Sequence, residues 1–262
     1  MGNLRIKNLQ FSFEDKQVFQ DVNFTLRKDK TLSIIGTPGS GKTTLLKLLN
    51  GEFNYDGEIV INGVDACLEN QNALHRVIAC VFLDSPFLTD LVKDELRFSL
   101  ENINMNPKDI QIKLDEINTF FGINKILNKK IDSLNKNDQI LVKILSYAIY
   151  NPSYLALDDL LIYLDNRTKI LLLNYLNSKN ITLINVTSDM EDVLYTDYIL
   201  CLYDGINAID GKTLDVLQNE KILKRLGFDL PFYVDLSLQC KSYELINKIY
   251  LNKESMVNSL WK

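Results

Sequence analysis

A glycine-rich segment with one lysine is the part of this sequence best suited to chemistry. It consists of Gly36, Thr37, Pro38, Gly39, Ser40, Gly41, Lys42, Thr43 and Thr44, and its first eight residues fit the pattern G-x-x-x-x-G-K-[ST]. Glycines let the backbone curl so that successive N–H groups point at phosphates, and a following helix N-terminus adds its positive dipole end. The pattern therefore predicts that these nine residues bind the phosphates of ATP or GTP.

Two residues of this loop have separate chemical tasks. We expect the ammonium group of Lys42 to reach the β- and γ-phosphates and the hydroxyl of Thr43 to bind Mg²⁺. The flanking sequence supports this, because residues 31–35 are typical of a buried strand and residues 44–49 of a helix closed by an Asn-Gly pair. A strand before the loop and a helix after it are the context that a phosphate-binding loop requires.

A pair of carboxylates follows an apolar segment later in the chain. Residues 154–157 are typical of a buried strand, and Asp158 and Asp159 come directly after it. A desolvated carboxylate is costly unless it is paired or bound to a metal. In P-loop enzymes an aspartate at this place holds Mg²⁺. We therefore predict that Thr43 and Asp158 are the Mg²⁺ ligands.

Length and composition limit the remaining possibilities. The 262 residues suffice for one large domain, alone or with an appendage, and the net charge of −5 argues against nucleic acid as a partner. We expect neither a transmembrane helix nor a signal peptide. The four cysteines form no C-x-x-C pair, which predicts buried free thiols and no metal site. The single histidine, His75, is expected at an exposed helix–strand junction.

The hydrophobic pattern together with the glycine-rich motif predicts an α/β fold, a P-loop NTPase mixed sheet with antiparallel N-terminal strands. An inserted helical subdomain is expected at about residues 88–150, within a nucleotide-binding domain of residues 1–212. A C-terminal helical extension is expected over residues 213–262. Strands are predicted at residues 4–13, 22–26, 31–35, 57–63, 77–82, 154–157, 182–186 and 198–203, and helices at residues 44–49, 94–101, 107–121, 138–150 and 167–176.

The order of these motifs resembles the ATPase subunit of ABC transporters. Asp165 falls where that family has its D-loop aspartate, and Phe13 where it has the aromatic residue that stacks on adenine. A core position in its strand is the alternative for Phe13. Residues 227–232 and 252–261 are similar to the C-terminal extension of the energy-coupling factor (ECF) type, which powers vitamin and metal uptake. The resemblance covers essentially the whole chain.

Four positions depart from the family pattern. Leu83 stands in place of a glutamine, Asp159 in place of the general-base glutamate and Ser188 in place of the switch histidine. The signature L-S-G-G-Q becomes L-N-K-N-D at residues 134–138, which adds side chains where the family has glycines. The resemblance assigns catalytic roles to Lys42, Asp159 and Ser188. The four departures together predict that nucleotide binding is kept while hydrolysis is impaired.

The resemblance implies an ATP-binding subunit of a membrane transporter that uses ATP and Mg²⁺ to drive uptake of a small nutrient. It would be peripheral at the cytoplasmic face of the membrane, docked on a transmembrane coupling subunit. Family members pair head to tail, so a homodimer of this chain would combine poor catalytic groups with a poor signature at both sites. A heterodimer with a second ABC ATPase is therefore favoured. Phe87, Leu88 and Leu91 are candidate contacts for the coupling helices or, equally, core residues of the helical subdomain.

Two other functions stay open at this stage. The first is a structural subunit that binds nucleotide without turnover and is paired with an intact ATPase, which the four departures favour. The second is a soluble ABC protein of repair or translation. The single-domain length, the lack of a coiled-coil pattern and the acidic balance count against it.

Overall fold

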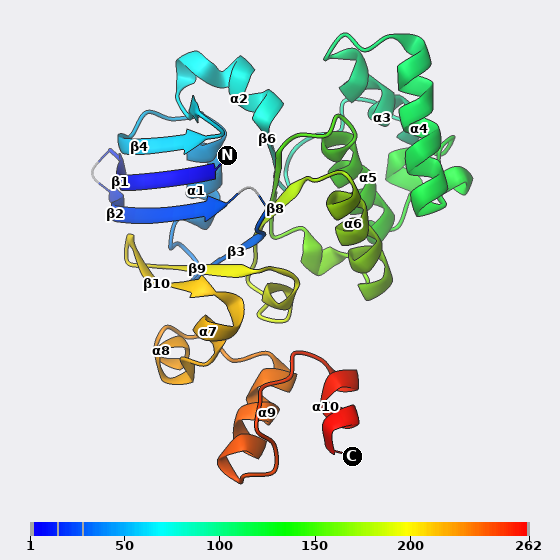
Figure 1. The fold of residues 1–262 in the computed structure, drawn as a ribbon. Coiled ribbons are helices and arrows are strands. Elements are labelled where there is room, and N and C mark those ends of the chain that lie inside the picture. The colour runs from blue at the N-terminus through cyan, green and yellow to red at the C-terminus, as the bar shows by residue number, and fades with distance from the viewer. Residues whose placement is uncertain (1–2, 15, 28, 261–262) are drawn as a thin grey trace.

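The computed structural model describes residues 3–14, 16–27 and 29–260, with the side chains of residues 259 and 260 left out. Within these ranges the strands form a single 10-stranded sheet in the order β5-β4-β1-β2-β10-β9-β3-β8-β7-β6 (Figure 1). The strands are β1 (Asn3–Phe13), β2 (Lys16–Arg27), β3 (Leu32–Gly36), β4 (Asp56–Ile61), β5 (Val64–Asp65), β6 (Ile78–Val81), β7 (Tyr154–Asp158), β8 (Thr182–Val186), β9 (Tyr198–Tyr203) and β10 (Ile206–Lys212).

The sheet has a parallel half and an antiparallel half. Strands β9, β3, β8, β7 and β6 are parallel to their neighbours within that series. Every residue of β3 and β8 is buried, as expected for parallel strands covered on both faces. Strands β1, β2 and β4 pair antiparallel, and their buried and exposed residues largely alternate. The predicted mixed sheet with antiparallel N-terminal strands is confirmed.

Ten helices longer than one turn cover the sheet and extend beyond it in the described residues. They are α1 (Lys42–Leu49), α2 (Gln71–Val77), α3 (Val92–Glu101), α4 (Pro107–Phe121), α5 (Lys136–Ala148), α6 (Asn166–Ser178), α7 (Thr213–Leu217), α8 (Glu220–Arg225), α9 (Phe232–Ser242) and α10 (Lys253–Leu260). Helices α3, α4 and α5 lie together on one side of the sheet, and α7 to α10 form the opposite, C-terminal end of the molecule (Figure 1).

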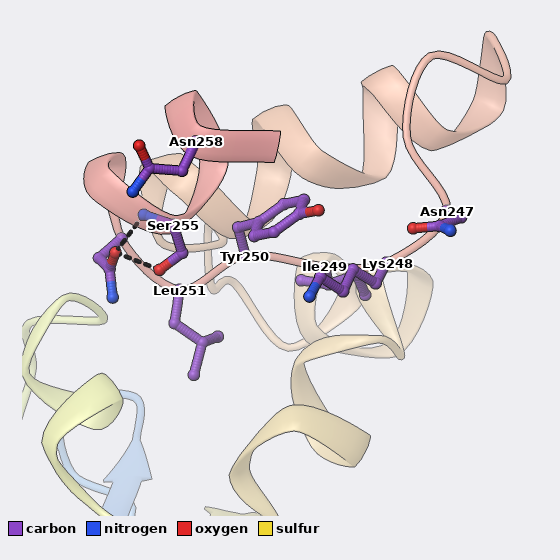
Figure 2. Close-up of a pocket in the computed structure, with 8 residues that line it drawn as sticks. Asn247, Lys248, Ile249, Tyr250, Leu251, Ser255 and Asn258 are labelled. Atoms are coloured by element: carbon purple, nitrogen blue, oxygen red, sulfur yellow. Dashed lines mark hydrogen bonds between the residues drawn. The ribbon is translucent and has the colours of Figure 1, made fainter. Parts of the chain in front are cut away.

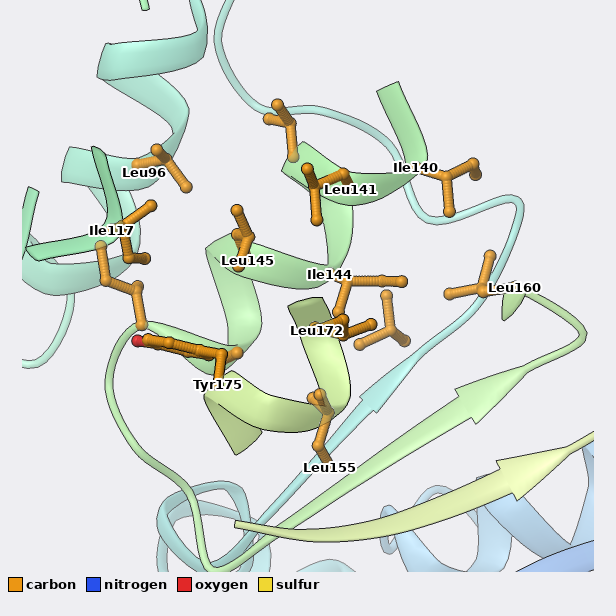
Figure 3. Packing of buried hydrophobic residues seen from close by; sticks show 14 of the residues in the cluster. Leu96, Ile117, Ile140, Leu141, Ile144, Leu145, Leu155, Leu160, Leu172 and Tyr175 are labelled. Carbon is orange, nitrogen blue, oxygen red and sulfur yellow. The ribbon is translucent and has the colours of Figure 1, made fainter. Parts of the chain in front are cut away.

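The helical subdomain shares its core with the sheet. Figure 3 shows Leu96 of α3, Ile117 of α4, Leu145 of α5 and Leu172 of α6 converging above Leu155 of β7. Each of these side chains is fully buried. Such burial stabilises the fold by about 1.5–3 kcal/mol per side chain. Helix α5, which begins at Lys136, is thereby held against both its neighbouring helices and the sheet.

Strand β10 and helix α2 lie outside the sequence-based expectation, as does the two-residue strand β5. Strand β10 contains no fully buried residue, so it leaves no apolar alternation to detect. It pairs with β9 after a turn in which Asp204 and Gly205 both have positive φ angles of 48° and 76°. Helix α2 buries only Leu74 and carries the exposed His75.

Other sequence-based expectations meet mixed outcomes. All four cysteines are free, but only Cys80 and Cys201 are buried, while Cys67 and Cys240 are half-buried. No group of three or more metal-binding side chains occurs in the described residues. Within the same residues, no helix combines the length and the apolar character that crossing a membrane requires.

Candidate functional site

The glycine-rich loop joins the end of β3 to the start of α1, as predicted. Gly39 and Gly41 have φ angles of 82° and 94°, which disfavour other residues. A Cβ atom on Gly41 would lie 2.8 Å from the Phe19 ring, and one on Gly36 would lie 2.7 Å from the carbonyl oxygen of Leu202. Crowding therefore explains the glycines at positions 36 and 41, and the positive φ angle explains Gly39, independently of any ligand.

The start of α1 and the Lys42 side chain fit a phosphate ligand. None of the described side chains caps this helix N-terminus, so its first N–H groups keep their donor capacity. The Lys42 ammonium donates to the carbonyl oxygens of Gly36 at 2.7 Å and Thr37 at 3.3 Å. Burial lowers the pKa of Lys42, and the nearby Asp159 and Asp158 oppose this shift. Phosphate oxygens would give this half-buried cation a stronger partner than loop carbonyls.

Thr43 and Asp158 meet across the site. The Thr43 hydroxyl donates to Oδ2 of Asp158 over 2.8 Å, which links the first turn of α1 to the end of β7. Burial raises the pKa of Asp158, and the hydrogen bond from Thr43 partly offsets this. A hydroxyl and a carboxylate oxygen are hard ligands of the kind that Mg²⁺ prefers. The pair predicted to hold Mg²⁺ is therefore brought together.

Asp159 and Ser188 are also brought together. The backbone N–H and the hydroxyl of Ser188 both donate to Oδ1 of Asp159, at 2.8 and 2.9 Å. The backbone of Asp159 has a φ angle of 50°, and its N–H donates to the carbonyl oxygen of Val186 at 3.0 Å. One oxygen of the expected general base is therefore already occupied by the residue at the switch position.

Phe13 lies at the end of β1 with 42% of its surface exposed, so it is not a buried core residue. Its ring meets Phe11 edge to face at 4.7 Å between centroids and Phe53 at 5.3 Å. Phe53 was not singled out from the sequence, although an aromatic residue soon after the helix-closing Asn-Gly pair was a visible signal. The adenine-stacking role of Phe13 stays a prediction.

The signature segment is tied to the D-loop of the same chain. Oδ1 of Asn137 accepts a hydrogen bond from the backbone N–H of Asp165 at 2.9 Å, and its amide donates to the Thr168 hydroxyl at 3.4 Å. The Lys136 ammonium lies 5.2 Å from the centre of the Tyr163 ring. The two side chains that replace glycines are therefore engaged within the chain.

Two buried charge systems beside the site were missed from the sequence. Lys169 of α6 pairs with the fully buried Asp192 at 2.5 Å, which joins the D-loop helix to the segment after Ser188. Lys143 of α5 donates to backbone carbonyl oxygens beyond β6. The only signal visible in the sequence was a lysine inside the apolar stretch of residues 140–150. The partners of Lys143 are backbone atoms distant in sequence, which no pattern of side chains reveals.

A separate hollow of about 610 Å³ lies near the C-terminal end, lined by residues 247–252 and by Ser255 and Asn258 of α10 (Figure 2). Its lining is mostly polar, and Asn252 there accepts hydrogen bonds from the backbone N–H and hydroxyl of Ser255. It shares no residue with the loop of residues 36–44. The hollow is therefore no part of the candidate nucleotide site.

Comparisons with known proteins identify relatives of the chain. A family model described as "ABC transporter" matches residues 19–161. The chain is 29% identical to the energy-coupling factor transporter ATP-binding protein EcfA of Malacoplasma penetrans, over 98% of this chain and 92% of that protein. It is 26% identical to EcfA1 of Leuconostoc mesenteroides, over 98% and 97% of the two chains.

Solved structures show the same fold. The cbiO1 protein of Clostridium perfringens, described as part of the ABC transporter complex cbiONQ, superposes with a TM-score of 0.75 at 21% identity, over 92% of this chain and 97% of that one. A nucleotide-free ATP-binding cassette from an ABC transporter gives a TM-score of 0.75 at 20% identity, over 87% and 100%.

Proposed function

The chain belongs to the ABC transporter family, as an ATP-binding subunit of the energy-coupling factor type, and we propose that it binds MgATP through residues 36–44 and turns it over slowly when alone. The observation that carries the proposal is the meeting of Lys42, Thr43 and Asp158 at one end of the parallel strands. The same end of such strands is where α/β folds bind their ligands.

The chain's own groups supply the steps of binding. Lys42 would exchange the carbonyl oxygens of Gly36 and Thr37 for β- and γ-phosphate oxygens, and the first N–H groups of α1 would donate to the same phosphates. Thr43 and Asp158 would hold Mg²⁺, which neutralises charge that develops during phosphoryl transfer. Phe13 would stack its exposed ring on adenine.

Hydrolysis needs a base that orients water against the γ-phosphate, and here that base is compromised. Asp159 carries its carboxylate one methylene closer to the backbone than a glutamate would. Ser188 donates two hydrogen bonds to Oδ1 of Asp159, so part of the acceptor capacity of that oxygen is already used. Leu83 cannot bind water or Mg²⁺. We therefore assign Lys42, Asp159 and Ser188 to catalysis, with a rate held low by the last two.

We further propose a heterodimer in which a second ABC ATPase supplies an intact signature. The chain's own signature segment is engaged by Tyr163, Asp165 and Thr168, which disfavours it as a γ-phosphate clamp. A transmembrane coupling subunit would hold the pair at the cytoplasmic face of the membrane. Leu88, which is 63% exposed, is the candidate contact for it, while Phe87 packs partly buried against the subdomain core.

A structural subunit without turnover is the second candidate function, and the Ser188–Asp159 contact favours it. Phosphate release in the assembled pair separates the two functions. The relatives are named as transporter components, so a role in repair or translation is set aside.

Calorimetric titration of the purified chain with MgATP tests the binding proposal. The parent is expected to bind, and Lys42→Ala to weaken binding by about 3 kcal/mol, roughly a hundredfold in Kd. Lys47→Ala on the same helix is the control and is expected to bind as the parent does. Equal affinity in the parent and Lys42→Ala would contradict the proposal.

A further inference from the structure

The segment of residues 83–89, which leads from β6 toward α3, is held by a buried cation on one side. The Lys143 ammonium of α5 donates to the carbonyl oxygen of Leu83 at 2.7 Å and to that of Ser85 at 2.5 Å. It also lies 5.0 Å from the centre of the Phe87 ring. Lys143 is only 6% exposed, so its charge depends on these backbone partners.

A buried anion holds the other half of the same segment. Oε2 of Glu95, on α3, accepts from the backbone N–H groups of Leu88 at 3.0 Å and Thr89 at 2.9 Å, and from the Thr89 hydroxyl at 3.0 Å. Glu95 is 5% exposed. The cation therefore binds carbonyl groups and the anion binds amide groups, so each charge meets the backbone dipoles that suit it.

The surroundings of Lys143 argue that this contact has a specific role. The neighbouring positions Ile140, Leu141, Val142, Ile144 and Leu145 are buried and apolar. An apolar residue would fill the same space without a desolvation cost, and burial does lower the pKa of Lys143. Because charge-assisted hydrogen bonds are about twice as strong as neutral ones, two of them offset that cost only while residues 83–85 stay against α5.

We propose that Lys143 and Glu95 clamp residues 83–89 to helices α5 and α3, so that this segment moves with the helical subdomain and not with the catalytic sheet. Lys143 is then a positioning residue for Leu83. Any shift of α5, which starts within the signature segment, carries Leu83 relative to Asp158 and Asp159. The functional role of that movement rests on the proposed function, whereas the existence of the clamp does not.

Amide hydrogen exchange on the full chain tests the clamp without a ligand. In Lys143→Met, the amides of Ser85, Leu88 and Thr89 should exchange about tenfold faster or more, while those of α4 and β8 keep their protection. Lys143→Arg should restore most of the protection, because it keeps the charge and the donors. Lys108→Met, an exposed site on α4 in the same subdomain, is the matched control and should change nothing. Unchanged loop exchange in Lys143→Met would overturn the proposal.

Coupling is tested by adding MgATP to the same samples. In the parent, protection at residues 83–89 and at residues 136–140 should change together. In Lys143→Met the change in protection at residues 136–140 should persist while the change at residues 83–89 is lost. In Lys143→Arg both segments should again respond to MgATP. If Lys143 only fills space, Lys143→Met should lower the melting temperature while the two segments still respond together. That result would overturn the positioning role.

A second variant keeps the proposal testable if Lys143→Met does not fold. Glu95→Gln should speed exchange at Leu88 and Thr89, and full protection there would contradict the clamp. A parent chain that fails to bind MgATP would count against the proposed function. The ligand-free comparison would still decide the clamp.

Discussion

Ser188 donates two hydrogen bonds to a single carboxylate oxygen, Oδ1 of Asp159, from its backbone N–H at 2.8 Å and its hydroxyl at 2.9 Å. This contact ties the segment after β8 to the segment after β7, directly beside the Thr43–Asp158 pair. It occupies Oδ1 of Asp159 within the chain, where a general base would need to face water. The contact is the structural reason to expect slow turnover.

Restoring the catalytic set is the first prediction. Asp159→Glu, Ser188→His and Leu83→Gln should each raise phosphate release little, and the triple variant should exceed the product of the three single effects. The reason is that base, switch and loop act on one water, and a misplacement of about 1 Å can cost roughly a hundredfold. Steady-state phosphate release, measured with a partner that has an intact signature, checks this. Purely multiplicative effects would argue that the positions act independently.

Truncation of Phe13 is the second prediction. Phe13→Ala should weaken MgATP binding by about 1–3 kcal/mol because a base–aromatic stack is lost. Its melting temperature should stay near that of the parent, since the ring is 42% exposed. Phe11→Ala is the matched control, and the loss of its buried ring should destabilise the fold by about 3–5 kcal/mol. If Phe13→Ala melts early yet binds with parental affinity, Phe13 is a packing residue.

Loss of the magnesium ligands is the third prediction. Thr43→Ala and Asp158→Asn should each weaken ATP binding in the presence of Mg²⁺ and change it far less in EDTA, because Thr43 and Asp158 act on the nucleotide through the ion. Calorimetry with and without Mg²⁺ gives both values. Ser153→Ala, at the residue just before β7, serves as the control. An equal loss in EDTA would contradict the assignment.

Breaking the buried Lys169–Asp192 pair is the fourth prediction. Lys169→Met should destabilise the fold by about 3–5 kcal/mol at pH 7, because it leaves the buried Asp192 carboxylate unpaired. Burial already raises the pKa of Asp192 while Lys169 opposes this, so the variant should raise it further. A folded-state pKa above the unfolded value of about 3.9 means that the folded state binds more protons, so stability falls as pH rises through that window.

The penalty of Lys169→Met should therefore shrink as pH is lowered from 7 toward 4, relative to the parent at each pH. Urea denaturation at several pH values measures it. Adding Asp192→Asn to Lys169→Met should recover part of the stability, since the uncompensated charge is removed. A penalty that is the same at all pH values would show that the carboxylate is not the source of the cost.

The sequence predicted best where local signals agree with tertiary structure. Helix α4 occupies residues 107–121 as expected, because Asn106 caps it, Pro107 occupies its first turn and Gly122 ends it with a φ angle of 67°. The glycine-rich loop between β3 and α1 was predictable because its glycines and lysine lie in one short stretch of sequence. Strand β10 was missed because it buries no residue fully.

The clamp and the Ser188–Asp159 contact show what sequence reasoning lacks. Asp159 and Ser188 were both singled out from the sequence, but only the structure shows that Ser188 donates hydrogen bonds to Asp159. Lys143 was visible as a lysine in an apolar stretch, yet its partners are carbonyl oxygens about 60 residues away in sequence. Contacts between a side chain and a distant backbone leave no pattern in a single sequence.

Phosphate release by the purified parent chain at saturating MgATP, in a sample whose ATP binding is verified by calorimetry, tests the central claim most directly. The account predicts clear binding with turnover far below one per second, a slow rate for an enzyme. Turnover near one per second or faster by the chain alone would contradict it, because Asp159, Ser188 and Leu83 would then form a competent site.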